Sequence, residues 1–234
     1  MVIEYLSGKL VKPNSIEKRD YQVSLADQAK TQNSLIVLPT GLGKTTIALE
    51  VILDILSQKK GGVLFLAPTR VLVNQHFEFL KEHVLLDDIG IVTGEDLISK
   101  RKKSWINSIV CATPEITRND LQRGVVPYEQ FSLVIFDEAH RAVGDYAYTS
   151  IATNFSNNVL FLAMTATLPS DKQRADEIIK SLRIQSILQK TDESPDVKPY
   201  IQETKTDWVN VELPLDMKAI QTCLKLALDE RYTQ

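Results

Sequence analysis

Short apolar runs alternate with stretches of helical periodicity along most of this chain. Apolar runs of four or five residues occur at 34–38, 63–67, 109–112, 133–136 and 159–163, with a further candidate at 89–93. They lack the polar alternation of half-exposed strands, which is typical of strands buried on both faces. Helical patterns lie between them, at 20–29, 45–58, 71–82, 113–123, 146–155 and 171–182. The alternation predicts a three-layer α/β fold with a central, mostly parallel sheet.

The chain divides into three parts by this pattern. Residues 1–190 carry the alternation and are expected to form one domain. Residues 191–214 are polar and hold Pro195 and Pro199, which predicts an exit linker ending in a candidate strand near 208–213. Residues 215–234 predict a helix with an apolar face that has no partner in the sequence.

Composition excludes some partners. A net charge of −3 and a sequence pI of about 5.7 argue against binding nucleic acid by bulk charge, so any such site must be local or shared with a part of the protein outside this sequence. Cys111 lies within an apolar run and Cys223 is remote from it, which predicts neither a disulfide nor a zinc site. No segment resembles a signal peptide or a membrane span, so we expect a reduced, intracellular compartment and no membrane partner.

A glycine-rich segment connects the first strand to the following helix. It holds Gly41 and Gly43 ahead of Lys44 and Thr45. Glycines let backbone N–H groups turn toward an anion, and the helix start adds its dipole. Lys44 would reach the β- and γ-phosphates of ATP, and Thr45 would hold Mg²⁺. Leu38 replaces the first glycine of the strict G-x-x-x-x-G-K-[ST] pattern, and a plain helix cap is the structural alternative.

Two acids follow the strand at 133–136. Asp137 is predicted to hold Mg²⁺, and Glu138 to orient and activate the attacking water. A lone acidic pair is more often a solvated turn. Its place at the carboxyl end of a buried parallel strand, where ligands bind in such sheets, favours the catalytic interpretation.

His140 is a candidate for coupling rather than for catalysis. It could hydrogen-bond towards Thr165 or Thr167, which follow the strand at 159–163 and could sense the γ-phosphate. A single histidine after an acidic pair is more often structural, so this role is a hypothesis.

In their order, these segments resemble the motifs of superfamily 2 helicases of the DExD/H-box type, in the first RecA-like domain. The sequence Asp137-Glu138-Ala139-His140 resembles the acidic motif of these helicases. Further short matches lie at 19–22, 38–45, 67–70, 93–94, 112–115 and 165–167. The glycine-rich segment and the stretches 194–200 and 208–214 are similar to the branch of the archaeal Hef helicase–nuclease and the Fanconi anaemia group M translocase. The resemblance implies an ATP-dependent DNA helicase that acts in DNA repair on forked or branched DNA.

The resemblance also implies site residues. The implied ATP-binding residues are Arg19, Gln22, Leu38, Pro39, Thr40, Gly41, Leu42, Gly43, Lys44, Thr45 and Thr46. The implied nucleic-acid contacts are Pro68, Thr69, Arg70, Gly94, Thr113, Pro114 and Glu115. Hydroxyls, a cation and backbone N–H groups are suited to phosphates, which are contacted without reading sequence.

A second RecA-like domain, and in this branch a nuclease domain, are implied as partners in the same protein. The second RecA-like domain supplies arginine fingers worth ~10³–10⁵ in rate. No second glycine-rich loop follows Leu188, so we expect the chain alone to bind ATP weakly and turn it over poorly. Residues 215–234 would begin a helical insertion between the two domains. We expect the cytoplasm of an archaeon or bacterium, or the nucleus of a eukaryote.

Two other functions remain open. An RNA-dependent ATPase of the double-stranded-RNA sensor or Dicer-like type shares much of this motif set, and a nucleotide-dependent binding module would need no turnover. The basic run 100–103, followed by Trp105, could touch DNA, although a solvated helix or loop is the favoured interpretation.

Overall fold

A computed structural model describes residues 4–201, 209, 211–212 and 214–232. Met1–Ile201 form one compact unit and Gln202–Gln234 a second, and each is described here by itself. None of the helices among the described residues is long and apolar enough to cross a membrane.

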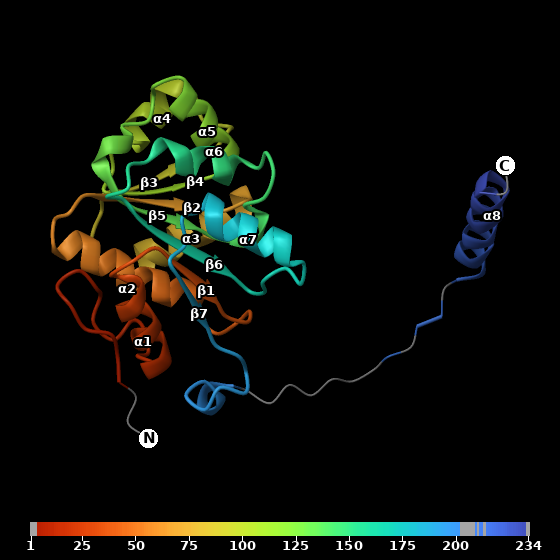
Figure 1. Ribbon diagram of the computed structural model, residues 1–234, viewed down its shortest axis with the longest axis horizontal. Coiled ribbons are helices and arrows are strands. Elements are labelled where there is room, and N and C mark those ends of the chain that lie inside the picture. Colours follow the sequence, from red (N-terminus) through yellow and green to blue (C-terminus); the bar gives the residue numbers. More distant parts are fainter. Residues whose placement is uncertain (1–3, 202–208, 210, 213, 233–234) are drawn as a thin grey trace. The chain divides into compact units, whose positions relative to one another are not determined.

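Within the described residues, seven strands form one wholly parallel sheet in the order β3-β4-β2-β5-β6-β1-β7 (Figure 1). Their bounds are β1 Ser34–Val37, β2 Gly62–Leu66, β3 Ile89–Val92, β4 Ile109–Ala112, β5 Phe131–Phe136, β6 Leu160–Thr165 and β7 Ser186–Gln189. The strands predicted within residues 1–190 are present. Strand β7 was missed because it lies at the sheet edge, where Ile187 is exposed and the apolar run is interrupted.

Helices cover both faces of the sheet, which confirms the predicted three layers (Figure 1). One face carries α1 Asp20–Ala29, α2 Lys44–Ser57 and α3 Arg70–His83; the other carries α4 Ile98–Ser104, α5 Pro114–Gln122, α6 Ala147–Asn154 and α7 Lys172–Ser181. Successive side chains of a strand point to opposite faces of the sheet, so they pack alternately into the hydrophobic core on each face. In β5, for example, Ile135 packs toward α2 and α3, whereas Val134 packs toward α6. The strands inside the sheet are therefore largely apolar, as the sequence indicated, whereas β7 at the margin is not.

The basic run 100–103 is not wholly exposed to solvent, although the sequence had suggested that it would be. It forms α4, in which Arg101 is buried and pairs through two nitrogens with Asp120, at 2.8 and 2.9 Å. Trp105 is fully buried and donates its indole N–H to the same carboxylate. The interpretation as a solvated segment therefore holds only for the exposed lysines of the run, because the Arg101–Asp120 pair anchors the helix to α5.

The segment after residue 190 folds back on the first unit, which ends at Ile201 rather than near 190. A turn closed by Ser194 leads to Val197, whose side chain is fully buried in the core, and to Tyr200, which packs against Tyr21. Lys190 pairs with Asp196 across the turn at 2.8 Å. This burial explains why two prolines here do not make a free linker.

The second unit is described mainly by α8, Leu215–Tyr232, which matches the predicted helix. Its apolar side chains, including Ile220 and Leu224, are exposed within this unit. The candidate strand near 208–213 falls largely outside the described residues. The described positions 209, 211 and 212 are not in a strand.

Glu50 of α2 is a buried acid with one carboxylate oxygen that has no hydrogen-bond partner. It is 9% exposed, and its Oε1 accepts no hydrogen bond. Burial raises the pKa of this carboxyl to about 7, which the charge of Lys30 only partly offsets. From its usual pKa near 4.5 up to about 7, the folded protein holds a proton that the unfolded chain releases. Glu50 therefore costs stability as the pH rises through this window.

We predict that Glu50→Gln raises the free energy of unfolding at pH 8 and flattens its decline between about pH 4.5 and 7. Urea unfolding followed by circular dichroism across this range measures both effects. Asp54→Asn, one turn further along α2, is the matched control and should leave the decline in place. An unchanged pH profile in Glu50→Gln would show that the carboxyl is not the cause.

Candidate active site

The predicted site residues lie at the carboxyl ends of the strands, which all fall along one edge of the sheet because the strands are parallel. We refer to this side as the sheet edge. The glycine-rich loop follows β1, Thr165 ends β6, and Asp137 follows β5, and these three strands are neighbours. The segments implied in nucleic-acid binding follow β2, β3 and β4, which form the other half of the sheet. The edge therefore has a nucleotide half and a nucleic-acid half, which meet where β5 pairs with β2.

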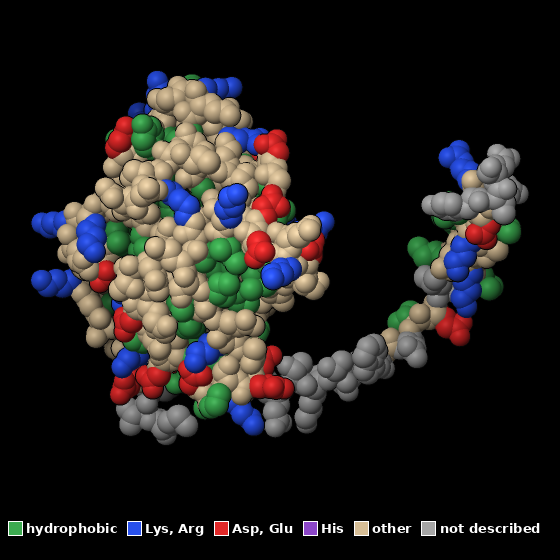
Figure 2. All heavy atoms as spheres, in the orientation of Figure 1, with side chains coloured by type: hydrophobic (Ala, Val, Ile, Leu, Met, Phe, Trp, Pro, Cys, Tyr) green, Lys and Arg blue, Asp and Glu red, His purple; other side chains and the backbone are tan. Residues whose placement is uncertain are grey.

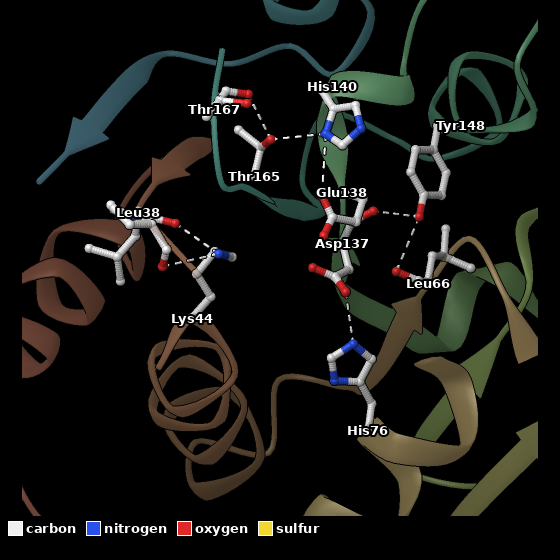
Figure 3. Close-up of polar contacts among 11 residues, drawn as sticks. Leu38, Lys44, Leu66, His76, Asp137, Glu138, His140, Tyr148, Thr165 and Thr167 are labelled. Carbon is white, nitrogen blue, oxygen red and sulfur yellow. Dashed lines mark hydrogen bonds and ion pairs between the residues drawn. The ribbon is translucent and has the colours of Figure 1, made fainter. Parts of the chain in front are cut away.

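The glycine-rich loop has the conformation that its sequence predicted. Gly41 and Gly43 have φ values of +88° and +78°, and α2 begins directly afterwards at Lys44. The Lys44 ammonium donates to the carbonyls of Leu38 and Pro39 at 2.8 and 3.4 Å (Figure 3). Burial lowers the pKa of Lys44, against the opposing charges of Glu138 and Asp137. A bound phosphate would supply a further negative charge beside this ammonium.

The segment at 19–22 reaches the same loop from α1. Tyr21 and Gln22 both donate to the carbonyl of Leu42, at 2.8 and 3.1 Å. The Oε1 atom of Gln22 is buried and accepts no hydrogen bond. An acceptor left open in this position suits an exocyclic amine such as that of adenine. The Arg19 guanidinium lies over the ring of Tyr200, 5.2 Å from its centroid.

Asp137 is held at three points. Its backbone N–H donates to Leu66 of β2 at 2.9 Å, and the Tyr148 hydroxyl donates to its carbonyl at 2.7 Å. Its Oδ2 lies 2.8 Å from Nε2 of His76, and both side chains are buried. Because an ionised carboxylate only accepts, the Nε2–H tautomer of His76 donates. Figure 3 shows the other carboxylate oxygen directed toward the side of Lys44.

Glu138 adopts a left-handed backbone conformation, with φ +51° and ψ +49°, which is uncommon for this residue type. Its carboxylate lies 3.3 Å from Nδ1 of His140, and that nitrogen lies 3.1 Å from the Thr165 hydroxyl. Thr165 donates its own proton to the Thr167 carbonyl at 2.9 Å, so Nδ1–H of His140 is the donor to both acceptors. The expected bond from His140 to Thr165 is confirmed, and Thr167 takes part through its backbone.

The residues implied in nucleic-acid binding are only partly on the surface. Thr69, Arg70, Gly94 and Glu115 are exposed, whereas Thr113 and Pro114 are buried. The hydroxyl of Thr69 accepts from the backbone of Leu72 and caps α3. Any contact at Thr113 must therefore come from the backbone at the start of α5, because the side chain is covered.

Local charge along this half of the edge is balanced. Arg70 forms an ion pair with Glu95, and a hollow between α3 and the segment after β3 is lined by both, with Asn74, Thr93 and Lys100. On the face shown in Figure 2, acidic and basic side chains are interspersed rather than gathered in a basic patch. The net charge of −3 and the pairing of Arg70 with Glu95 argue against binding of nucleic acid by bulk charge.

Three residues of the site were missed by sequence reasoning. His76 lies on the inward stripe of α3 with Val73 and Leu80, and a polar residue on such a stripe was the available signal. Tyr148 of α6 is buried among apolar residues and gave no signal beyond helical periodicity. Tyr200 lies in the segment interpreted as a linker.

The residues present fit a magnesium nucleotide. A Cβ at Gly41 would meet nothing within 4 Å, so the loop is open there, and the Gln22 side chain with its open acceptor lies against Gly43 of the same loop. Asp137 could offer a carboxylate oxygen and Thr45 a hydroxyl, the hard donors that Mg²⁺ prefers together with phosphate oxygens. These positions were assigned to ATP and Mg²⁺ from the sequence, and the geometry is compatible with that assignment.

Comparison with known proteins matches residues 19–175 to the DEAD/DEAH box helicase family. A putative ATP-dependent RNA helicase of Methanocaldococcus jannaschii is 37% identical over 230 residues, covering 97% of this chain and 30% of the relative. The ATP-dependent DNA helicase MPH1 of Saccharomyces cerevisiae is 35% identical over 229 residues, covering 93% and 23%. The Fanconi anemia group M protein homolog of Mus musculus is 35% identical over 216 residues, covering 89% and 11%.

Among solved structures, the crystal structure of the Pyrococcus furiosus Hef helicase domain superposes with a TM-score of 0.79 and 41% identity. The match covers 84% of this chain and 43% of that one. The chain therefore spans less than half of that structure and less than a third of the three sequence relatives.

The two loop glycines provide a matched pair for testing this geometry. A Cβ at Gly43 would overlap the side-chain amide of Gln22, whereas a Cβ at Gly41 would meet nothing within 4 Å. Both alanines would pay the left-handed backbone cost of ~1–2 kcal/mol. We predict that Gly43→Ala lowers the free energy of unfolding by more than Gly41→Ala does, in urea unfolding. Combining Gly43→Ala with Gln22→Ala should recover part of the difference, and equal losses for the two glycines would contradict the packing described.

Proposed function

The chain belongs to the DEAD/DEAH box helicase family, and on that premise we propose that it is the ATP-binding motor domain of a DNA helicase or translocase. The activity that we propose is nucleic-acid-dependent ATP hydrolysis on forked or branched DNA, in the service of DNA repair. Similarity to the Fanconi anemia group M homolog and to the Hef helicase domain supports this branch of the family.

One observation carries the proposal: Lys44, which follows β1, lies at the same end of the sheet as Glu138 and His140, which follow β5. Lys44 would neutralise phosphate charge from the start of α2. Glu138, held in an uncommon backbone conformation, would orient and activate the attacking water. His140 would report the state of the site to Thr165 and Thr167 through the hydrogen bonds described above.

Magnesium completes the proposed site. Asp137 and Thr45 would hold the ion, and a bound Mg²⁺ would neutralise the developing charge on the phosphates. The chain's own contribution is to keep one Asp137 oxygen directed toward Lys44, through the restraints on its backbone and on its other oxygen.

The proposed nucleic-acid track lies on the other half of the edge, where Thr69, Arg70 and Gly94 are exposed and the backbone at Thr113 begins α5. We favour DNA because MPH1 is named a DNA helicase. Double-stranded RNA is the second candidate, because the Methanocaldococcus relative is named an RNA helicase.

We also propose that a second RecA-like domain of the same protein closes the site and supplies arginine fingers. The length of the relatives supports this proposal, since the chain spans 30% or less of each. A nuclease domain in the same protein belongs to the same proposal. The experiments below therefore use the full-length protein.

We predict that Lys44→Ala abolishes tight ATP binding, and that Glu138→Gln keeps binding but slows nucleic-acid-stimulated turnover by about 10²-fold or more. Phosphate release and equilibrium binding of a fluorescent ATP analogue measure the two effects. Lys103→Ala, an exposed lysine outside the site, is the control and should behave as wild type.

Comparing stimulation by forked DNA and by double-stranded RNA decides the substrate. Greater stimulation by RNA would overturn the preference for DNA. Full cellular function in Lys44→Ala would instead favour a binding module that does not hydrolyse ATP.

Arg70 and Glu95 should act in opposite directions on nucleic-acid affinity. Arg70→Ala removes a cation from the proposed track, whereas Glu95→Gln removes an acid that competes with phosphate for Arg70. We predict weaker binding of forked DNA for the first variant and tighter binding for the second, by fluorescence anisotropy at fixed salt. A salt titration should give a shallower slope for Arg70→Ala. The same direction of change in both variants would remove Arg70 from the track.

A further inference from the structure

His76 is the one side chain among the described residues that hydrogen-bonds the carboxylate of Asp137. The distance is 2.8 Å, and both side chains are more than nine-tenths buried. Burial of this kind is stable only when the polar atoms are paired, so the two groups hold one another in a defined orientation. The family match and the motif pattern explain Asp137 but do not account for its partner.

The imidazole of His76 is itself fixed in place. Its ring packs against Phe65 of β2, with centroids 4.3 Å apart and an interplanar angle of 30°. The next residue of β2, Leu66, accepts the backbone N–H of Asp137 and lies 3.3 Å from the Tyr148 hydroxyl. The backbone of Asp137 is thus bonded directly to β2, and its carboxylate is held by His76, which packs on β2. The carboxylate can rotate only if the hydrogen bond to His76 breaks.

His76 also connects the two halves of the sheet edge. It lies on α3 less than two turns after Arg70, the exposed cation of the proposed nucleic-acid track. A helix of this length moves as a rigid element, so a displacement at its first turn carries His76 with it. Figure 3 shows His76 and Lys44 on different sides of Asp137.

We propose that His76 is a positioning residue for the magnesium site. By occupying Oδ2 of Asp137 it directs the other oxygen to the metal, and it ties that carboxylate to α3 and hence to the nucleic-acid track. This inference rests on the proposed function, since it takes Asp137 as a metal ligand. Hydrogen bonds that orient a metal ligand in this way typically change metal affinity or activity 10–100-fold when they are removed.

The test compares substitutions at His76 that differ in reach. His76→Gln places an amide N–H near the position of Nε2, whereas His76→Asn is too short and His76→Leu has no donor. The readout in the full-length protein is the Mg²⁺ concentration for half-maximal binding of a fluorescent ADP analogue, with and without forked DNA. We expect an increase of about ten-fold or more for Asn and Leu, little change for Gln, and a smaller effect of DNA on binding in Asn and Leu. Binding in EDTA should be the same in all variants.

His83→Leu is the matched control, because His83 lies on the same helix and packs against Phe79 at its far end. It should leave the Mg²⁺ dependence unchanged. Equal Mg²⁺ dependence in wild type, Asn and Leu would overturn the inference, as would a folded Gln variant as impaired as Asn. If Leu fails to fold, the comparison of Gln with Asn still decides. A wild-type protein whose nucleotide binding does not respond to Mg²⁺ would instead overturn the proposed function.

Discussion

Parallel pairing of β1, β6, β5 and β2 is the constraint on which the site depends. Parallel strands end at one edge, so the strand pairing by itself brings together loops that are remote in sequence. Pairing also requires helical crossovers, which bury both faces and make the central strands largely apolar. The same constraint thus explains the core and the arrival of Lys44 and Glu138 at one end of the sheet.

The elements that could be predicted from the sequence are those governed by periodicity and by local backbone chemistry. The predicted bounds are correct for helix α1, Asp20–Ala29, and for strand β4, Ile109–Ala112. An amphipathic stripe marks the extent of the helix, and an uninterrupted apolar run marks the extent of the strand. The left-handed glycines of the loop were predictable for the same reason, since few other residues adopt that conformation. His140 reached Thr165 because both follow strands that end at one edge.

What could not be predicted depends on tertiary contacts. The burial of Arg101 could not be predicted, because its neighbours in the run are exposed lysines. Arg101 turns inward because Asp120 lies there to pair with it. Thr113 was expected to offer a hydroxyl, but packing at the start of α5 covers it. The partnership of His76 with Asp137 joins residues far apart in the chain, and it follows from the adjacency of β2 and β5, which periodicity does not reveal.

The segment that ends the first unit has a mechanical consequence. Val197 is buried in the core and Tyr200 rests on Tyr21 and Arg19, so the chain leaves this unit from beside the start of α1. Tension applied beyond Ile201 is therefore borne first by that aromatic contact, before it reaches any strand. A pull on the chain beyond Ile201 would pass through Tyr200 to Tyr21, whose hydroxyl donates to the carbonyl of Leu42 in the glycine-rich loop.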